Sequence, residues 1–486
     1  MPVGQVLHRL RWFGRGSRTA WAVALTAVVW SGVVTTAAVS AGRVRGIEAI
    51  DVAPVWAGHP VGFALVTAGD RQYVAYYAAD RHLTVAARDL AGDEWTFFRL
   101  PSAQPGPPTE PGQTSAVLGW DSHNGIAMAA DGAGHLHLAG NMHNNGLTYY
   151  RTQVPAAIET FEQVPAMVGR EEKRCTYPMF LTRTDGLLLF RYRSGGSGNG
   201  RDYFNAYDES DRSWRRLFEE PFFDGDEERS AYAHQPILGP DGRYHLSWVW
   251  RDTPDCSTNH DLGYARSSDL IEWETIDGRG IALPIRLDTP GIVVDPVPVE
   301  GGILNGTGRV GFDSRGRPVL AYYKYDPAGR SQAFVARHEG DAWQIRQVSD
   351  WNDRFELTGR GSLPTAHISL GAVEPAAKGE LRLAFSHAKE GTGVWLLADE
   401  SLAVIRTEPA SPKSLPAELT RVESSFPGMA VRTADDQGAS GIPGRRFVLR
   451  WETLNSNRDQ PHEDPWPEPS MLRVVEVDDS PGAEYP

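Results

Sequence analysis

The sequence has only two cysteines, Cys175 and Cys256, in 486 residues. So few cysteines exclude a scaffold held together by several disulfides, and they exclude a zinc site built from four cysteines. The two residues could still form one bridge in an exported protein, or one of them could bind a metal ion. The sequence leaves both alternatives open.

Positive charge is also scarce, with 48 Lys and Arg against 62 Asp and Glu and a formal net charge of −14. Binding to nucleic acid needs clustered positive charge, so nucleic acid is not an expected partner. The same excess of negative charge would repel an acidic polymer, unless a local group of arginines makes one part of the surface positive.

Long apolar runs are absent after residue 42, so no later transmembrane helix is expected. The N-terminus differs: four arginines in the first 18 residues precede an uncharged stretch, which ends in the small residues Val39-Ser40-Ala41. This pattern predicts a secretory signal peptide in residues 1–41 and a secreted, extracellular protein. The alternative is an uncleaved anchor with the rest of the chain facing outside, and only then is a membrane a partner.

What the sequence has in quantity is glycine, with 50 residues, and a repeated strand pattern. A glycine-containing turn, often Asp-Gly, precedes a β-rich strand in six places, and a seventh strand follows near the C-terminus. Most copies continue into a second strand and a third that bears tryptophan. The seven copies start at Gly69, Asp131, Asp185, Asp241, Gly316, Gly379 and Arg446.

Repeats of about 50–60 residues, each forming a small antiparallel sheet, are typical of a β-propeller, because neighbouring blades cover one another's faces. We therefore predict an all-β, seven-bladed propeller over residues 50–455. A two-sheet sandwich is the rival fold. Residues 456–486 are acidic and rich in proline, which predicts a loosely attached C-terminal tail.

Two polar clusters flank the turn at Asp131: Asp121-Ser122-His123-Asn124 and Asn141-Met142-His143-Asn144-Asn145. Because both lie at one end of the same predicted blade, His123 and His143 are candidates for a proton-transfer pair. An imidazole, with a pKa near 6.5, can take or give a proton at neutral pH. The alternative is a pair of hydrogen-bonded loop histidines without a catalytic role.

The next repeat adds arginines to this region. Arg191 and Arg193 point to the same side of a strand, and an arginine fork binds a carboxylate bidentately. With Arg201 they place three positive charges in a stretch without an acidic residue. Tyr177 could serve as acid or base if nearby arginines lowered its pKa, or it could simply cap the blade.

These candidate residues belong to a set of motifs that occur in a fixed order along the chain: Ser-His-Asn-Gly, Gly-Asn-Met-His, Thr-Tyr-Pro-Met-Phe, Phe-Arg-Tyr-Arg-Ser-Gly and Asn-His-Asp-Leu-Gly-Tyr-Ala-Arg-Ser-Ser-Asp. Over residues 60–400 the chain resembles the BNR-repeat-like propeller polysaccharide lyases, best known as ulvan lyases. The resemblance implies a seven-bladed propeller that cleaves an acidic, uronate-containing polysaccharide by β-elimination and leaves an unsaturated uronate end. It assigns the catalytic positions to His123, His143, Tyr177 and Arg193.

The resemblance also implies roles for these residues. Arg193 would neutralise the uronate carboxylate, and His123 and Tyr177 would share the roles of base and acid in an order left open. His143 would orient the carboxylate or act as the base for the other C5 epimer. The expected contacts to the sugar or its carboxylate are Asn124, Asn144, Arg191, Tyr232 and His234.

No cofactor is required for this chemistry, but the family carries a metal that looks structural. His245, Cys256 and His260 are the candidate ligands for such a zinc or calcium ion, although their spacing matches no zinc signature. A free buried cysteine and hydrogen-bonded histidines are the alternative.

Two other functions remain open. Residues 267–273 form a degenerate Asp-box, the turn signature of sialidase-type propellers, so a sialidase-like glycoside hydrolase is one alternative. The arginine triad of such an enzyme is not evident in the sequence. A carbohydrate-binding propeller without catalytic activity is the other alternative.

Overall fold

The computed structural model describes residues 42–44, 47–364, 367–409, 420–438 and 444–478, all within one unit of the chain, Val34–Pro486. The expected signal peptide, residues 1–41, lies outside the described residues. None of the described helices is long and apolar enough to cross a membrane.

Aspartate turns recur at the start of the second strand of several sheets. In the turns at Asp131, Asp185, Asp241 and Asp313, the carboxylate accepts a hydrogen bond from the backbone N–H two residues later. Such Asx turns reverse the chain between consecutive antiparallel strands. The turn-and-strand repeat predicted from the sequence is therefore present as a structural repeat.

The described residues form seven sheets, and every strand pairing within them is antiparallel. The first two sheets hold β3 (Ala64–Ala68), β4 (Arg71–Tyr77), β5 (Leu83–Asp89) and β6 (Thr96–Arg99), then β7 (Ala127–Ala130), β8 (Leu136–Ala139), β10 (Tyr149–Thr152) and β11 (Phe161–Gln163). The third sheet holds β9 (His143–Asn145), β12 (Cys175–Thr182), β13 (Leu188–Ser194), β14 (Arg201–Asp208) and β15 (Ser213–Arg216). The fourth holds β16 (Ser230–Ala233), β17 (Ile237–Leu238), β18 (Tyr244–Arg251), β19 (Asn259–Ser267), β20 (Trp273–Glu274), β21 (Gly280–Ile281) and β22 (Val293–Asp295).

The remaining three sheets are built in the same way. The fifth and sixth hold β23 (Arg309–Phe312), β24 (Pro318–Tyr325), β25 (Ser331–Glu339) and β26 (Ala342–Gln347), then β27 (Ile368–Pro375), β28 (Glu380–His387), β29 (Gly391–Ala398) and β30 (Val404–Pro409). The seventh holds β1 (Gly42–Val44), β2 (Ile47–Val55), β31 (Met429–Asp435), β32 (Arg445–Leu454) and β33 (Ser470–Asp478). Three short 3-10 helices lie between strands: η1 (Ile158–Thr160), η2 (Cys256–Thr258) and η3 (Ala377–Gly379).

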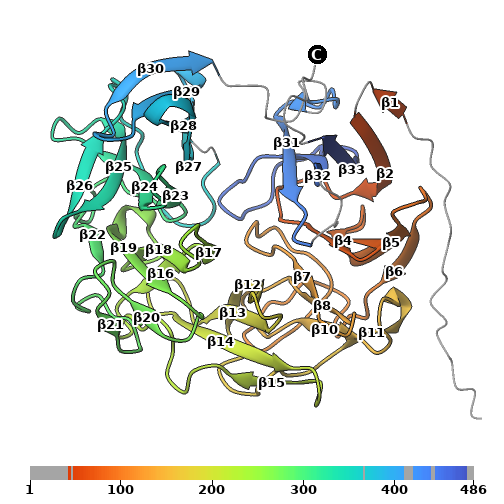
Figure 1. Ribbon diagram of the computed structural model, residues 1–486. Helices are drawn as coiled ribbons and strands as arrows, with labels where there is room; N and C mark the ends of the chain where they lie inside the picture. The colour runs from red at the N-terminus through yellow and green to blue at the C-terminus, as the bar shows by residue number, and fades with distance from the viewer. Residues whose placement is uncertain (1–41, 45–46, 365–366, 410–419, 439–443, 479–486) are drawn as a thin grey trace, which may run out of the picture. The chain divides into compact units, whose positions relative to one another are not determined.

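The sheets follow one another around a common centre (Figure 1). Their central strands are buried on both faces; every residue of β13 and of β18 is buried. A strand buried on both faces needs a partner layer on each side, and neighbouring sheets supply it. The two-sheet sandwich is excluded for the described residues, which form seven sheets.

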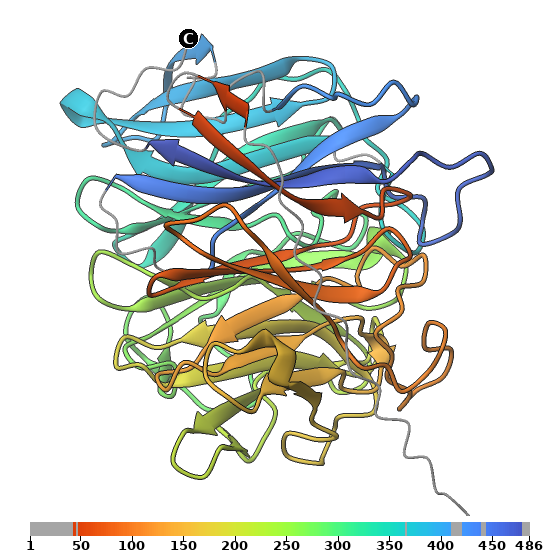
Figure 2. The same cartoon turned by 90° about the vertical axis from the view of Figure 1, so that its right-hand side faces the viewer.

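The first and last strands of the described residues belong to the seventh sheet. Strand β33, the last described strand, lies between β2 and β32, so it pairs directly with a strand from the N-terminal part of the chain, as Figures 1 and 2 show. The expectation of a loose tail is therefore wrong for residues 470–478. Val474, Val475 and Val477 are buried in this strand, and the proline-rich stretch before it concealed the strand pattern in the sequence.

A substitution in β33 tests whether residues 470–478 form a strand of the seventh sheet or a loosely attached tail. Val474 is 1% exposed and packs in the hydrophobic core shared with β32. Val474→Asp should lower the free energy of unfolding by at least about 3 kcal/mol, because it buries an unpaired charge. Denaturant unfolding measures this, with the exposed Glu468→Gln as control. Equal stability of both variants would contradict the position of β33.

Candidate active site

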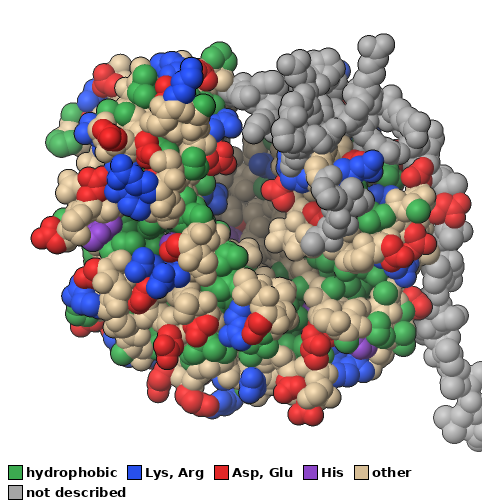
Figure 3. Space-filling model, viewed as in Figure 1, with side chains coloured by type: hydrophobic (Ala, Val, Ile, Leu, Met, Phe, Trp, Pro, Cys, Tyr) green, Lys and Arg blue, Asp and Glu red, His purple; other side chains and the backbone are tan. Residues whose placement is uncertain are grey.

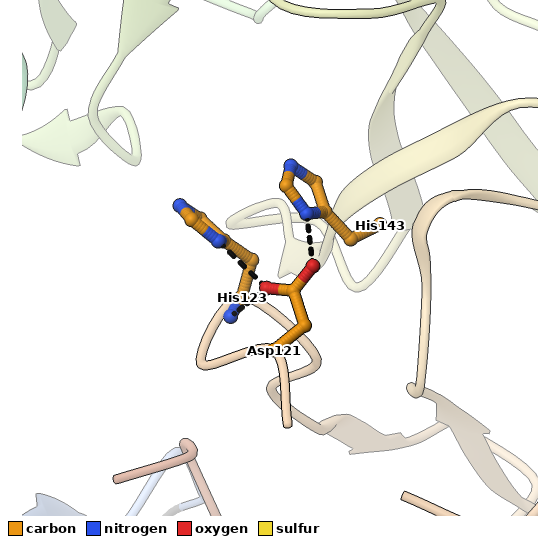
Figure 4. Close-up of side chains that lie close together, drawn as sticks. All are labelled: Asp121, His123 and His143. Carbon is orange, nitrogen blue, oxygen red and sulfur yellow. Dashed lines mark hydrogen bonds and ion pairs between the residues drawn. The ribbon is translucent and has the colours of Figure 1, made fainter. Parts of the chain in front are cut away.

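Asp121 joins the two histidines predicted as a pair. The Nδ1 atom of His123 lies 2.8 Å from one carboxylate oxygen of Asp121, and Nδ1 of His143 bonds to the other oxygen (Figure 4). The two imidazole rings stack with centroids 4.2 Å apart. Because each Nδ1 faces Asp121, each Nε2 points away from it (Figure 4) and is available for proton transfer.

Local backbone structure brings these residues together. The backbone N–H of His123 donates to the side chain of Asp121 at 2.9 Å, which closes an Asx turn in the loop before β7. His143 is the first residue of β9. This strand pairs with β12 of the third sheet and not with the strands next to it in sequence, and the pairing places His143 opposite Thr176. This crossing of β9 places His143 beside Tyr177, the residue after Thr176.

A second carboxylate reaches His123 from the C-terminal region. Asp459 lies 3.4 Å from Nδ1 of His123 and accepts hydrogen bonds from the backbone N–H groups of Ser122 and Ser362. Burial opposes the charged imidazolium, but the phenol oxygen of Tyr177 and the carboxylates of Asp121 and Asp459 outweigh it, so the pKa of His123 lies well above its usual value. His123 is therefore protonated at neutral pH.

The same contacts keep Asp121 ionised. Burial alone would raise the pKa of its carboxyl group, but the hydrogen bonds from His123 and His143 lower the pKa of Asp121 far below its usual value. A charged Asp121 fixes the orientation of both rings across the pH range in which histidine titrates.

Tyr177 sits on an irregular part of β12. The register between β12 and β13 shifts between Thr176 and Met179, and Tyr177 has a positive φ of 57°. This conformation is costly for a residue with a side chain and is typical of functional positions. It directs the Tyr177 ring towards His123, with ring centroids 5.9 Å apart, and under the guanidinium of Arg193 at 4.9 Å.

Arg193 is a buried cation without an acidic partner among the described residues. It is 2% exposed, and its Nε and Nη1 atoms have no hydrogen-bond partner. Its guanidinium lies between the rings of Tyr177 and Tyr232, 5.2 Å from the latter. A Cβ atom at Gly200 would come within 2.5 Å of the Arg193 side chain, so the glycine leaves the space that the arginine occupies. Unused donors on a buried arginine indicate a binding site for an anion.

These groups line one cavity of about 310 Å³, in which His123, Tyr177, Arg193, Tyr232 and His234 contribute to the walls. The face of the molecule drawn in Figure 3 is hollowed near its centre, around which the sheets are arranged in Figure 1. Burial raises the pKa of Tyr232, but the guanidiniums of Arg193 and Arg251 prevail and lower the pKa of this phenol.

The other arginines of the predicted cluster are paired with acids. Arg191 donates to Asp202 through Nε and Nη2, and its Nη1 donates to the backbone oxygen of His234. Arg201 bonds to Asp224 at 3.1 Å. Of the three arginines, only Arg193 has no acidic partner among the described residues.

The predicted amide contacts lie at the edge of the site. Asn124 is buried, and its Oδ1 has no hydrogen-bond partner among the described residues. Asn144 accepts a hydrogen bond from Arg174 at 2.8 Å, and its backbone N–H donates to Thr176. Neither asparagine lines the cavity described above. His234 does, and its Nε2 faces the carbonyl oxygen of Thr307 at 3.0 Å.

The structure does not bring the candidate metal ligands together. His245 faces Arg266 across the β18–β19 pair, whereas His260 faces Trp250 further along. Both ring nitrogens of His245 are engaged, by Tyr264 and Asp241, and both cysteines are buried and unbridged. These residues do not fit a shared metal ion.

Among the described residues, one group has ligand atoms close enough to hold a metal ion: Asp121, His123 and His143, whose candidate atoms lie within 4.8 Å of one another. In the structure these atoms instead bond to each other. Two site residues were missing from the sequence prediction. Asp121 could have been found from the Asp-x-His spacing of an Asx turn, but no local signal points to Asp459, which lies 336 residues after His123.

Comparison with known proteins agrees with the fold and the family. Residues 71–351, more than half of the chain, match the family described as BNR repeat-containing family member. A solved PL25 ulvan lyase superposes with a TM-score of 0.58 at 14% identity, covering 88% of this chain and 95% of that chain. The same kind of enzyme bound to -[GlcA(1-4)Rha3S]- gives a TM-score of 0.57, also at 14% identity, with coverage of 88% and 95%.

Two curated relatives match shorter segments. The short isoform of ulvan lyase from Alteromonas sp. (strain LOR) is 31% identical over 137 residues, which is 25% of this chain and 26% of the relative. The long isoform from Glaciecola sp. (strain KUL10) is 51% identical over 44 residues, 9% of this chain and 4% of the relative. The chain thus matches about a quarter or less of the length of these relatives. Because the family match covers most of the repeats, the chain belongs to the BNR repeat-containing family.

Proposed function

We propose that the protein is a polysaccharide lyase that cleaves a uronate-containing polysaccharide of the ulvan type by β-elimination. The observation that carries this proposal is the buried Arg193, which has donors without a hydrogen-bond partner and lines the same cavity as His123 and Tyr177. The ulvan lyases among the relatives and solved structures support the choice of substrate class.

The first requirement of this reaction is to make the C5 proton of a uronate acidic. A charged carboxylate next to C5 opposes removal of the proton, because the carbanion adds a second negative charge. Arg193 would bind the carboxylate through its guanidinium group and stabilise the enolate-like charge that develops on it. The buried position of Arg193 strengthens this interaction, because water does not screen it.

The second requirement is an acid and a base placed around two adjacent sugar atoms. His123 is protonated and serves as the acid, whereas the side-chain oxygen of Tyr177 serves as the base. Tyr177 takes the C5 proton, the electron pair forms the C4–C5 double bond, and the C4–O4 bond breaks. Nε2 of His123 gives its proton to the departing O4, and exchange with water restores both groups.

His143 and two wall residues of the cavity would position the sugar. His143, stacked on His123 and held by Asp121, would orient the carboxylate through Nε2. Tyr232 and His234 line the cavity and would contact the sugar there.

We further propose that the seven sheets are the blades of a seven-bladed propeller, and that the protein is exported. The blade count is supported by the seven antiparallel sheets. Export is supported only by the basic and apolar pattern of residues 1–41.

The appearance of a conjugated uronate tests the reaction directly. Incubation with ulvan should raise the ultraviolet absorbance of the unsaturated product and shorten the polymer, because elimination alone creates a double bond next to the carboxylate. Chain shortening without this absorbance would indicate a hydrolase, and release of sialic acid from a sialoside would indicate a sialidase. Binding without shortening would leave a carbohydrate-binding protein.

The pH dependence tests the role of Asp459. An acid works in its protonated form, so activity should fall as the pH rises through the raised pKa of His123. Asp459→Asn removes one of the carboxylates that raise this pKa. The alkaline limb of the kcat profile should then move to lower pH by about one unit, while activity well below the limb stays close to wild type.

The control for this experiment is Glu463→Gln, an exposed residue of the same loop, which should leave the profile unchanged. Asp459→Glu should restore part of the shift, because it returns the charge. An alkaline limb that stays in place in Asp459→Asn would contradict the role of Asp459.

A further inference from the structure

A second cavity adjoins the proposed catalytic cavity. It has a volume of about 260 Å³ and shares Asn305 and Gly306 with the first, so the two spaces are neighbours along one wall. Strands β23 and β27 contribute its other sides, and these strands pack against each other. This volume is below the roughly 300–1,000 Å³ of pockets for drug-sized ligands, which suits a single sugar unit.

Arg309 at the start of β23 supplies the positive charge of this second cavity. It is exposed, and its side chain has no hydrogen bond or ion pair with any described residue. Two other arginines near the strand ends of this sheet are paired: Arg317 with Asp313 and Arg330 with Asp326. In a chain of net charge −14, a free arginine that lines a cavity is available for an anion.

The rest of the described lining suits an anionic sugar. No described residue of this lining is an aspartate or glutamate. The rings of Phe355 and His367 stack with centroids 4.4 Å apart and form a flat apolar wall, and Ser369 adds a hydroxyl group. An apolar wall with a few polar groups is the usual composition of a ligand pocket.

His234 shows how close Arg309 lies to the catalytic cavity. It lines that cavity, and its Nε2 bonds to the carbonyl oxygen of Thr307, a residue of the second cavity. Burial, together with the charges of Arg309 and Arg191, lowers the pKa of His234 to about 4. The imidazole is therefore neutral at neutral pH, and it lies between the two cavities.

We propose that the second cavity is a subsite for the sugar next to the uronate, and that Arg309 binds a sulfate ester on this sugar. The inference rests on the proposed function, in which Arg193 binds the uronate carboxylate. A sulfate ester is charged at every working pH and offers the guanidinium two oxygens. Two arginines in adjoining cavities thus match a polymer in which carboxylate and sulfate groups alternate.

The test compares Arg309→Ala with wild type on ulvan and on the same ulvan after chemical desulfation. Arg309→Ala should raise KM for the sulfated polymer at least ten-fold, about 1.4 kcal/mol, and leave kcat and the KM for the desulfated polymer close to wild type. Arg315→Ala is the matched control, because this exposed arginine lies in the turn after β23 and lines neither cavity.

Direct binding separates this inference from the lyase proposal. Calorimetric titration with sulfated and desulfated ulvan oligosaccharides measures the affinity of the subsite for each form, even if the protein cleaves neither. Tighter binding of the sulfated form that Arg309→Ala abolishes would support the subsite, whatever the outcome of the absorbance assay. An equal loss on both forms would assign Arg309 to a carboxylate or hydroxyl group, and either that result or no loss at all would overturn the proposal.

Discussion

Replacing Arg193 by methionine should lower kcat/KM on ulvan by roughly a thousand-fold. The reason is that Arg193 is the only arginine without an acidic partner among the described residues lining the catalytic cavity, where Arg191 is bound to Asp202. Without it, the carbanion formed at C5 has no cation to share its charge. Initial rates of unsaturated product, measured across substrate concentrations, give kcat/KM for each variant.

Two further variants make this result specific. Arg193→Lys should recover little activity, because an ammonium group cannot reproduce the planar fork. Arg201→Met removes an arginine from the same hairpin that already pairs with Asp224, and it should retain most activity. Thermal unfolding should show that Arg193→Met stays folded, since methionine keeps most of the buried volume. Substantial activity in this variant would contradict the proposed carboxylate site.

The arginines are a part of the site that could not be predicted in full from the sequence alone. Three arginines without an acid in residues 191–201 predicted a positive cluster, but Asp202 follows immediately and neutralises Arg191. The strand register places Asp202 opposite Arg193, yet its carboxylate bonds to Arg191. Which arginine stays free depends on side-chain directions across two strands, and no local pattern contains that information.

Other parts of the molecule were predictable to different degrees. The aspartate turns are local, so they indicated the repeated sheets, and the histidine pair flanks one such turn. The place of β33 and the contact of Asp459 with His123 join residues from opposite ends of the sequence. These contacts depend on the closure of the seventh sheet, which a single sequence does not reveal.

Removing the phenol oxygen of Tyr177 should have an effect of similar size to the loss of Arg193. Tyr177→Phe keeps the ring beside His123 and under Arg193 but removes the proposed base. We expect kcat to fall by roughly a thousand-fold, within the range for general bases, with little change in KM. If Tyr177 only capped the blade, the phenylalanine would serve as well and the activity would persist.

Tyr203→Phe is the matched control for this substitution. Tyr203 also lies beneath an arginine, with the guanidinium of Arg216 at 4.3 Å, but it is outside the catalytic cavity. Near-wild-type activity in Tyr203→Phe would show that the loss in Tyr177→Phe comes from the site and not from the removal of a hydroxyl group from any tyrosine beneath an arginine.

Hydrogen exchange at C5 distinguishes the base from the acid. If Tyr177 removes the C5 proton and His123 protonates O4, then His123→Asn stalls the reaction after deprotonation, and the substrate should take up deuterium at C5 from heavy water. Tyr177→Phe should show neither product nor exchange, because the proton is never removed. Nuclear magnetic resonance of recovered oligosaccharide measures the exchange. Exchange in Tyr177→Phe but not in His123→Asn would reverse the two roles, and the raised pKa of His123 would then need a different function, such as pairing with the substrate carboxylate.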